Sequence, residues 1–389
     1  MTDVAIASTE LRDAQAGEAL AAKVRSELRG VTPDALIVFA SSQNDYGALL
    51  GALHSRCGAK AMIGCSSAGE FTSKTSGTGL TTVIALRAPE MHFSAAITHG
   101  LSSDRDTTAR DLVQGFQGLD TSEYRYRTAL ILVDALAGHA EDFVDRLTIA
   151  TGGMYKFFGG GAGDDGLFKE THVFHGTEAH SDAAVALEIL SNKPIGIGAR
   201  HGWLPAGDPL RVTQANSSCV VSFNVSPAVE AFEEHAAVSN QQFDRADPMP
   251  FFLHNVVGMK TDDGFKLRVP LGVDDEGGIV CAAEVPTGVL AHIMSTQAVD
   301  AADAAASATR DAIDQVEREG HTPKAALFFD CVATRLRLGQ DFTHELDAVA
   351  RELKNAPFVG FNSYGQIVRA EGQFSGFHNC TAVVCVFPE

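Results

Sequence analysis

The chain has 389 residues, 45% of them apolar and 20% charged, and its 49 Asp and Glu outnumber its 30 Lys and Arg to give a net charge of −19. This length exceeds what one hydrophobic core usually supports, so we expect two domains, and the apolar content excludes a disordered protein. The negative field would repel a nucleic-acid backbone or an anionic membrane, which argues against either as a partner.

The seven cysteines are odd in number and scattered through mostly apolar segments. That usage is typical of reduced thiols in a cytosol rather than of a disulfide framework. Residues 1–5 do not begin a basic region followed by a long apolar core, and no run of about 18 apolar residues occurs in the sequence. We therefore expect a soluble, cytoplasmic protein without membrane insertion.

The predicted elements begin within residues 1–33, where apolar residues at helical spacing predict a surface helix. Residues 34–224 then form a predicted α/β domain, to which antiparallel hairpins are added. One such hairpin pairs residues 80–86 with 91–97. Strand texture gives way to a helix soon after residue 224, so the second domain is placed at 225–389.

Within the second domain the sequence predicts both helices and strands. An alanine-rich stretch predicts a helix, and two Asp followed by Glu and two Gly predict a hairpin turn. The expected elements are a helix at 228–235, strands around 251–257, 265–269 and 279–283, the turn at 274–278, the helix at 297–318 and a final strand at 381–387.

Three glycine-rich turns recur along the chain, at 63–71, 158–165 and 359–367. An apolar run and then an amphipathic segment precede each turn, so the repeated unit is a strand, a helix, a second strand and the turn. A helical crossover between two apolar strands predicts a parallel pair with a right-handed connection. The fold class is therefore α/β with α+β additions, built on repeated β-α-β units. The three apolar runs are 35–40, 129–134 and 325–330.

The turns themselves are candidates for a binding site. Open α/β sheets hold their ligands at the carboxyl ends of the strands, and glycines let backbone N–H groups approach a ligand closely. One glycine turn alone would be simple punctuation between elements. Three equivalent turns with polar residues instead favour a ligand crevice that they share.

The order and spacing of these motifs resemble the FIST family, in which an N-terminal FIST domain is followed by its C-terminal partner. The likeness covers nearly the whole chain from about residue 34. The family pattern more often has Glu where this chain has Gln366, and Gln where it has Cys380. The matching segments are 64–70, 159–165, His201 to Trp203 with Val212 and Thr213, Cys331 with Arg335, 360–366 and 378–381.

This resemblance implies a sensory, small-ligand-binding module of bacterial signal transduction, with molecules such as amino acids proposed as ligands. The sequence has no recognisable kinase, cyclase or DNA-binding segment, so we expect its output to pass through a partner such as a histidine kinase. Some members of the family are haemoproteins that sense nitric oxide and act on a partner histidine kinase.

Our first hypothesis is a ligand held at the turns by hydrogen bonds from Ser66, Ser67, Asn362, Ser363 and Tyr364. Asp164 would orient the ligand, or it would simply cap the following segment, and Arg335 is available for a carboxylate. The other candidate ligand-binding residues lie in or near the three turns: Cys65, Gly69, Glu70, Gly160, Gly161, Gly365 and Asn379.

Two alternatives remain open. A haem-dependent gas sensor would need an axial ligand, for which His201 and His378 are the candidates. An acyl- or amide-transfer enzyme would use Cys65 as nucleophile, which requires a thiol of low pKa. Because Gly-Cys-Ser-Ser differs from the Gly-x-Ser-x-Gly elbow, we expect a binding protein rather than an enzyme.

Overall fold

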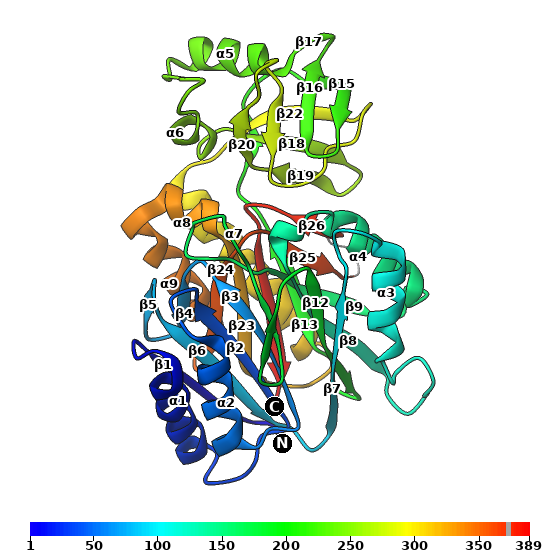
Figure 1. Cartoon of the computed structure of the whole chain (residues 1–389), viewed down its shortest axis with the longest axis vertical. Helices are drawn as coiled ribbons and strands as arrows, with labels where there is room; N and C mark the ends of the chain where they lie inside the picture. The colour runs from blue at the N-terminus through cyan, green and yellow to red at the C-terminus, as the bar shows by residue number, and fades with distance from the viewer. Residues whose placement is uncertain (371–374) are drawn as a thin grey trace.

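Each of the three repeated units folds as a strand, a helix and a second strand parallel to the first (Figure 1). The computed structural model describes residues 1–370 and 375–389. The unit strands are buried on both faces, as their continuous apolar runs require. The mixed α/β class is confirmed. Unit 1 is β2 (Ala35–Ser41), α2 (Tyr46–Cys57) and β3 (Ala61–Ser67); unit 2 is β8 (Tyr126–Val133), α4 (Ala140–Ala150) and β9 (Lys156–Gly161); unit 3 is β23 (Pro323–Cys331), α9 (Phe342–Leu353) and β24 (Phe358–Ser363).

The units lie in three separate six-stranded sheets that share one strand order. Two antiparallel strands flank the first strand of each unit, and an antiparallel hairpin flanks the second. The orders are β1–β6–β2–β3–β10–β11, β7–β12–β8–β9–β25–β26 and β13–β27–β23–β24–β4–β5. The flanking strands are β1 (Asp3–Thr9), β4 (Glu70–Thr72), β5 (Ser76–Gly77), β6 (Thr81–Arg87), β7 (Met91–His99), β10 (Val173–His175), β11 (Glu178–His180), β12 (Ala183–Ser191), β13 (Gly196–Arg200), β25 (Gln366–Arg369), β26 (Gly376–His378) and β27 (Ala382–Pro388).

The hairpin in each sheet belongs to the chain that leaves another unit, not to the unit in that sheet. The chain leaving unit 1 forms β4 and β5 beside β24 of unit 3. The chain leaving unit 2 forms β10 and β11 beside β3 of unit 1, and the chain leaving unit 3 forms β25 and β26 beside β9 of unit 2. This cyclic exchange interlocks the three sheets around a pseudo-threefold arrangement.

A pair of helices covers the outer face of each sheet, and the inner faces share one core. Phe39 of β2, Leu132 of β8 and Phe329 of β23 belong to a single buried cluster. In the described part of the chain, no helix combines the length and apolar character needed to cross a bilayer. The outer pairs are α1 (Asp13–Glu27) with α2, α3 (Arg105–Gln114) with α4 and α7 (Ala298–Glu317) with α9; the short connectors are η1 (Ala135–Ala137), α8 (Val332–Leu338) and η2 (Gly339–Asp341).

A smaller domain, residues 204–295, stands at the top of Figure 1 as a nine-stranded sheet with α5 and α6. The expected boundary at 224/225 falls inside this sheet, because β15 and β16 before it pair with β22 and β21 after it. The elements are β14 (Leu204–Pro205), β15 (Leu210–Asn216), β16 (Cys219–Phe223), β17 (Ser226–Pro227), α5 (Ala228–Ser239), α6 (Met249–Phe252), β18 (Val256–Thr261), β19 (Gly264–Arg268), β20 (Pro270–Val273), β21 (Ile279–Cys281) and β22 (Leu290–Ser295).

Some local expectations are wrong. Residues 80–86 and 91–97 do not form a hairpin, because both edges of β6 are taken by β1 and β2 while β7 pairs with β12. The expected strand at 251–257 begins as helix α6, since prolines suit the first turn of a helix and Pro248 and Pro250 lie there. The N-terminal segment holds strand β1 as well as the expected helix α1.

In each unit the second strand carries a glycine where its backbone lies very close to the parallel first strand. A Cβ at Gly360 would overlap the carbonyl oxygen of Phe328, and one at Gly64 would overlap that of Val38. We expect Gly360→Ala to lower the free energy of unfolding by about 3 kcal/mol, measured by urea denaturation. Gly51→Ala is the control: a Cβ on this residue of α2 meets nothing within 4 Å, so it should raise stability by ~0.5–1 kcal/mol. Equal stabilities of the two variants would show that the close approach of β24 to β23 at Gly360 tolerates a side chain.

Candidate functional site

The three glycine turns meet directly through a ring of backbone hydrogen bonds. Each turn donates one N–H to the carbonyl of a neighbouring turn, so the backbone itself fills the centre where a shared crevice was expected. The bonds run from the N–H of Ala68 to the oxygen of Asn362 at 3.0 Å, from Gly163 to Ser66 at 2.9 Å and from Tyr364 to Gly161 at 3.0 Å.

Arg335 enters beside this ring at the junction of units 1 and 3. It is carried by α8, which begins directly after β23, and its Nη1 donates to the oxygen of Ala68 at 2.9 Å. Gly69 has a φ of 141°, and a Cβ there would overlap the guanidinium. Glycine at this position therefore permits the close approach of Arg335.

Glu70, Arg335 and Asn362 line a cavity of about 170 Å³ at the same junction. The amide nitrogen of Asn362 is buried, and within residues 1–370 and 375–389 it has no hydrogen-bond partner. Buried polar groups are normally paired, so this donor is available to a ligand. The Ala68 contact uses one nitrogen of the partly buried Arg335 guanidinium. The cavity thus combines a cation, an amide donor and a carboxyl group.

Glu70 is completely buried on one side of this cavity. It accepts hydrogen bonds from the hydroxyl of Ser67 and, at 3.0 Å, from the N–H of Leu80. Burial raises the pKa of Glu70 to about 8, and the charge of Asp165 adds to this, although the two hydrogen bonds and Arg335 oppose it. The carboxyl is therefore mostly protonated at neutral pH.

The other serines of the turns hold the backbone. The Ser66 hydroxyl accepts the N–H of His172 at 2.9 Å. The Ser363 hydroxyl donates to the oxygen of Asp330 at 3.1 Å and accepts from Nε2 of Gln366 at 2.8 Å. Both serines are fully buried, so their role in this structure is to position the turns. The glycines of the second and third turns, Gly160, Gly161 and Gly365, are packed in and beside the backbone ring.

Asp164 closes the loop that follows the second turn. Its carboxylate accepts the N–H groups of Phe168, Lys169 and Glu170 at 2.8, 2.6 and 3.0 Å and the hydroxyl of Tyr364. Against the effect of burial, these bonds keep the pKa of Asp164 below its usual value. The geometry therefore supports the capping role of Asp164. Tyr364 contributes to the same loop, because its hydroxyl donates to Asp164 and its ring stacks on Phe168 at a centroid distance of 4.3 Å.

Two further candidate residues lie away from the cavity. Cys65 packs in the central apolar core, and burial raises the pKa of its thiol, whereas an activated nucleophile has a lowered pKa. Asn379 lies near the small domain, where its side-chain oxygen accepts the N–H of Val269 at 3.3 Å. Neither residue lines the cavity beside Arg335.

The histidines considered for haem do not fit that group. Nε2 of His201 lies 2.9 Å from the oxygen of Phe265, and the N–H of Trp203 donates to Nδ1 at 3.3 Å. The cavity beside His201 holds about 10 Å³, whereas a haem needs an apolar slot. His378 is fully buried and has partners within the protein. The described residues also contain no group of three or more His, Cys, Asp or Glu placed to hold a metal ion.

Several residues of the cavity wall were not predicted from the sequence. Ser76 arrives on the exchanged hairpin, and Phe342 and Thr343 arrive at the start of α9. No motif marks these positions, and the pairing of β4 with β24 is what brings the hairpin next to unit 3.

Family models match two consecutive parts of the sequence. The FIST N domain matches residues 34–226 and the FIST C domain matches residues 228–369. The chain belongs to the FIST family. FIST domains are sensor domains of signalling proteins and bind small ligands.

Solved structures give only a distant likeness to this FIST protein. A cyanuric acid hydrolase from A. caulinodans is 7% identical with a TM-score of 0.33, over 99% of each chain. A second cyanuric acid hydrolase structure is 10% identical with a TM-score of 0.34, over 100% of each chain. PurL of T. maritima in complex with FGAR is 11% identical with a TM-score of 0.24, over 100% of this chain and 72% of PurL. These scores are too low to carry an argument about function, and no curated protein matches the sequence.

The raised pKa of Glu70 predicts a pH-dependent stability. The folded state keeps a proton on Glu70 that the unfolded chain releases above about pH 4.5. The stabilisation that this group contributes to the folded state is therefore complete below that pH and is lost as the pH rises through about 8. We expect the free energy of unfolding, measured by urea denaturation, to decline between pH 5 and 8 by on the order of a few kcal/mol less in Glu70→Gln than in the wild-type protein. Identical pH profiles for the two proteins would show that Glu70 does not carry a raised pKa.

Proposed function

We propose that the protein is a cytoplasmic sensor that binds a small ligand in the cavity between units 1 and 3 and reports its occupancy to a partner such as a histidine kinase. The observation that supports this site is the buried, unpaired amide nitrogen of Asn362 beside the guanidinium of Arg335, as found among the described residues. Both are donors, so they suit a ligand carboxylate.

The third polar group favours a ligand that also carries an amine. A ligand ammonium close to Glu70 would stabilise the ionised carboxylate and lower its pKa, so binding would release a proton. With about 170 Å³ of space, the cavity suits a compact molecule. An amino acid combines these features, in agreement with the ligand class that the family resemblance implies.

Helix α8 offers a route from the cavity to the small domain. Arg335 on this helix faces the cavity, while the guanidinium of Arg337 lies 5.4 Å from the ring centre of Trp203. Trp203 immediately precedes the first strand of the small domain and packs with Val256 and Met294 of that domain. We propose that a ligand held by Arg335 fixes α8 and thereby biases the position of the small domain, which the partner would sense.

We propose a binding rather than a catalytic role. Cys65, the nucleophile that an acyl- or amide-transfer reaction would use, lies in the core with a raised thiol pKa. Neither this feature nor the surroundings of His201 favours the enzyme or the haem alternative over the small-ligand sensor.

The ligand site can be tested with a thermal-shift screen of amino acids and other small carboxylates, followed by calorimetric titration of the best ligand. We expect Arg335→Gln and Asn362→Ala to weaken binding by roughly tenfold or more, because each removes a donor to the carboxylate. Arg351→Gln, on the exposed side of α9, should leave affinity unchanged. Ser66→Ala should change it by less than about twofold, because that hydroxyl is held by the backbone. A ligand that binds all four variants equally would place the site elsewhere.

The haem alternative has a separate test. We expect purified protein to show no saturable haem uptake in its visible absorption spectrum, because both ring nitrogens of His201 are engaged within the protein. A saturable Soret band that moves in a His201→Ala or His378→Ala variant would contradict this expectation and identify the axial ligand.

A further inference from the structure

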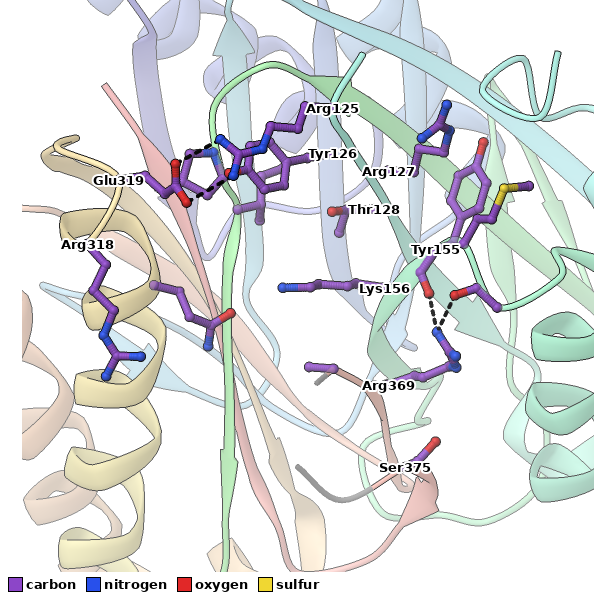
Figure 2. Close-up of a pocket in the computed structure, with 16 residues that line it drawn as sticks. Arg125, Tyr126, Arg127, Thr128, Tyr155, Lys156, Arg318, Glu319, Arg369 and Ser375 are labelled. Carbon is purple, nitrogen blue, oxygen red and sulfur yellow. Dashed lines mark hydrogen bonds and ion pairs between the residues drawn. The ribbon is translucent and has the colours of Figure 1, made fainter. Parts of the chain in front are cut away.

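A second, larger cavity of about 700 Å³ opens at the opposite end of unit 2 (Figure 2). It lies at the amino ends of β8 and β9, whereas the glycine turns lie at their carboxyl ends. Its other walls come from the segment just before β13, from the end of α7 with the two residues that follow it, and from the end of β25. Cavities of this size commonly hold small organic molecules.

The charge of this cavity is opposite to that of the protein. Over the whole chain, 49 acidic residues outnumber 30 basic ones. Among the described residues of the cavity wall the balance reverses, with five cations against one carboxylate, that of Glu319. An anion repelled by most of the surface would therefore be attracted here. The cations are Arg125, Arg127, Lys156, Arg318 and Arg369.

Three of these cations already bind other residues of the protein. Arg125 forms a two-pronged ion pair with Glu319, the one carboxylate among the described residues of the wall. Arg127 and Arg369 donate to backbone carbonyls and hold the surrounding loops. The bonds are Arg125 to Glu319 at 2.9 and 3.2 Å, Arg127 to the oxygens of Gly118 and Thr121, both at 2.6 Å, and Arg369 to those of Gly153 and Tyr155 at 3.2 and 2.6 Å.

The other two cations are available to a ligand. Lys156 extends from β9 into the cavity (Figure 2), and no hydrogen bond or ion pair of its ammonium is found in residues 1–370 and 375–389. Arg318 directly follows α7. Its side chain is 77% exposed, and its one ion pair among the described residues is a 3.6 Å contact with Asp314. Thr128 lies on the strand beside Lys156. Two cations from elements far apart in the sequence, β9 and the end of α7, thus line one cavity.

We propose that this cavity binds a small organic anion with at least two negative charges, carried by phosphate groups or by carboxylates. Lys156 and Arg318 supply the charge contacts, and the Arg125–Glu319 pair closes one end of the site. Lys156 offers a mobile ammonium, while Arg318 offers a planar fork that matches either kind of oxyanion. The site is separate from the proposed sensor cavity, and the two proposals stand or fall independently.

The test is calorimetric titration at low ionic strength with three probes: ATP without magnesium, inorganic pyrophosphate and citrate. We expect at least one probe to bind the wild-type protein, and the preferred probe distinguishes a phosphate ligand from a polycarboxylate. Lys156→Glu and Arg318→Glu should each weaken binding by roughly tenfold or more. Lys156→Gln, which removes the charge without reversing it, should also weaken binding. It replaces Lys156→Glu in the test if the charge reversal prevents folding.

Lys74→Glu is the matched control, because it makes the same charge change at an exposed lysine between β4 and β5. We expect it to alter affinity by less than about twofold, since exposed charges at a distance are screened. Arg335→Gln should likewise leave anion binding intact. The proposal is overturned if no probe binds the wild-type protein, or if Lys74→Glu weakens binding as much as Lys156→Glu does.

Discussion

The ring of three backbone hydrogen bonds between the glycine turns is the constraint on which the rest of this structure depends. Each bond joins one unit to the next, so no unit completes its turn alone. The chain that leaves each turn then continues into a neighbouring sheet. The ring and this exchange of hairpins together hold the three sheets to one another. The ring also brings together turns that lie far apart in the sequence.

The backbone repeats, but the side chains at equivalent positions have different tasks. Glu70, Asp165 and Gln366 occupy corresponding places after the three turns. The Asp165 carboxylate accepts bonds from Ser41 and Ser42, and the Gln366 amide is used by Ser363 and by the backbone of Thr381. Glu70 alone of the three lines the cavity that Arg335 reaches. A symmetric frame thus carries an asymmetric site.

Much of the local structure could be predicted from the sequence, because apolar periodicity and glycine turns are local signals. The helical faces with Leu50, Phe143 and Leu346 pack as their spacing predicts. The choice of strand partners could not be predicted, since an isolated strand does not encode which edge it will join. For the same reason the contact of Arg335 with Ala68, 267 residues apart in sequence, was not predicted; the family resemblance marked Arg335 only as a candidate for a ligand carboxylate.

The burial of Glu70 connects the fold to the proposed sensing. A carboxyl that is fully buried has lost its hydration, and its hydrogen bonds with Ser67 and Leu80 offset only part of that loss, because its pKa stays raised. An opposite charge placed beside it would recover electrostatic energy that the ligand-free protein lacks. The unpaired amide of Asn362 would gain in the same way from an acceptor. Since both groups lie where units 1 and 3 meet, the proposed ligand would stabilise that junction and, through α8, the base of the small domain.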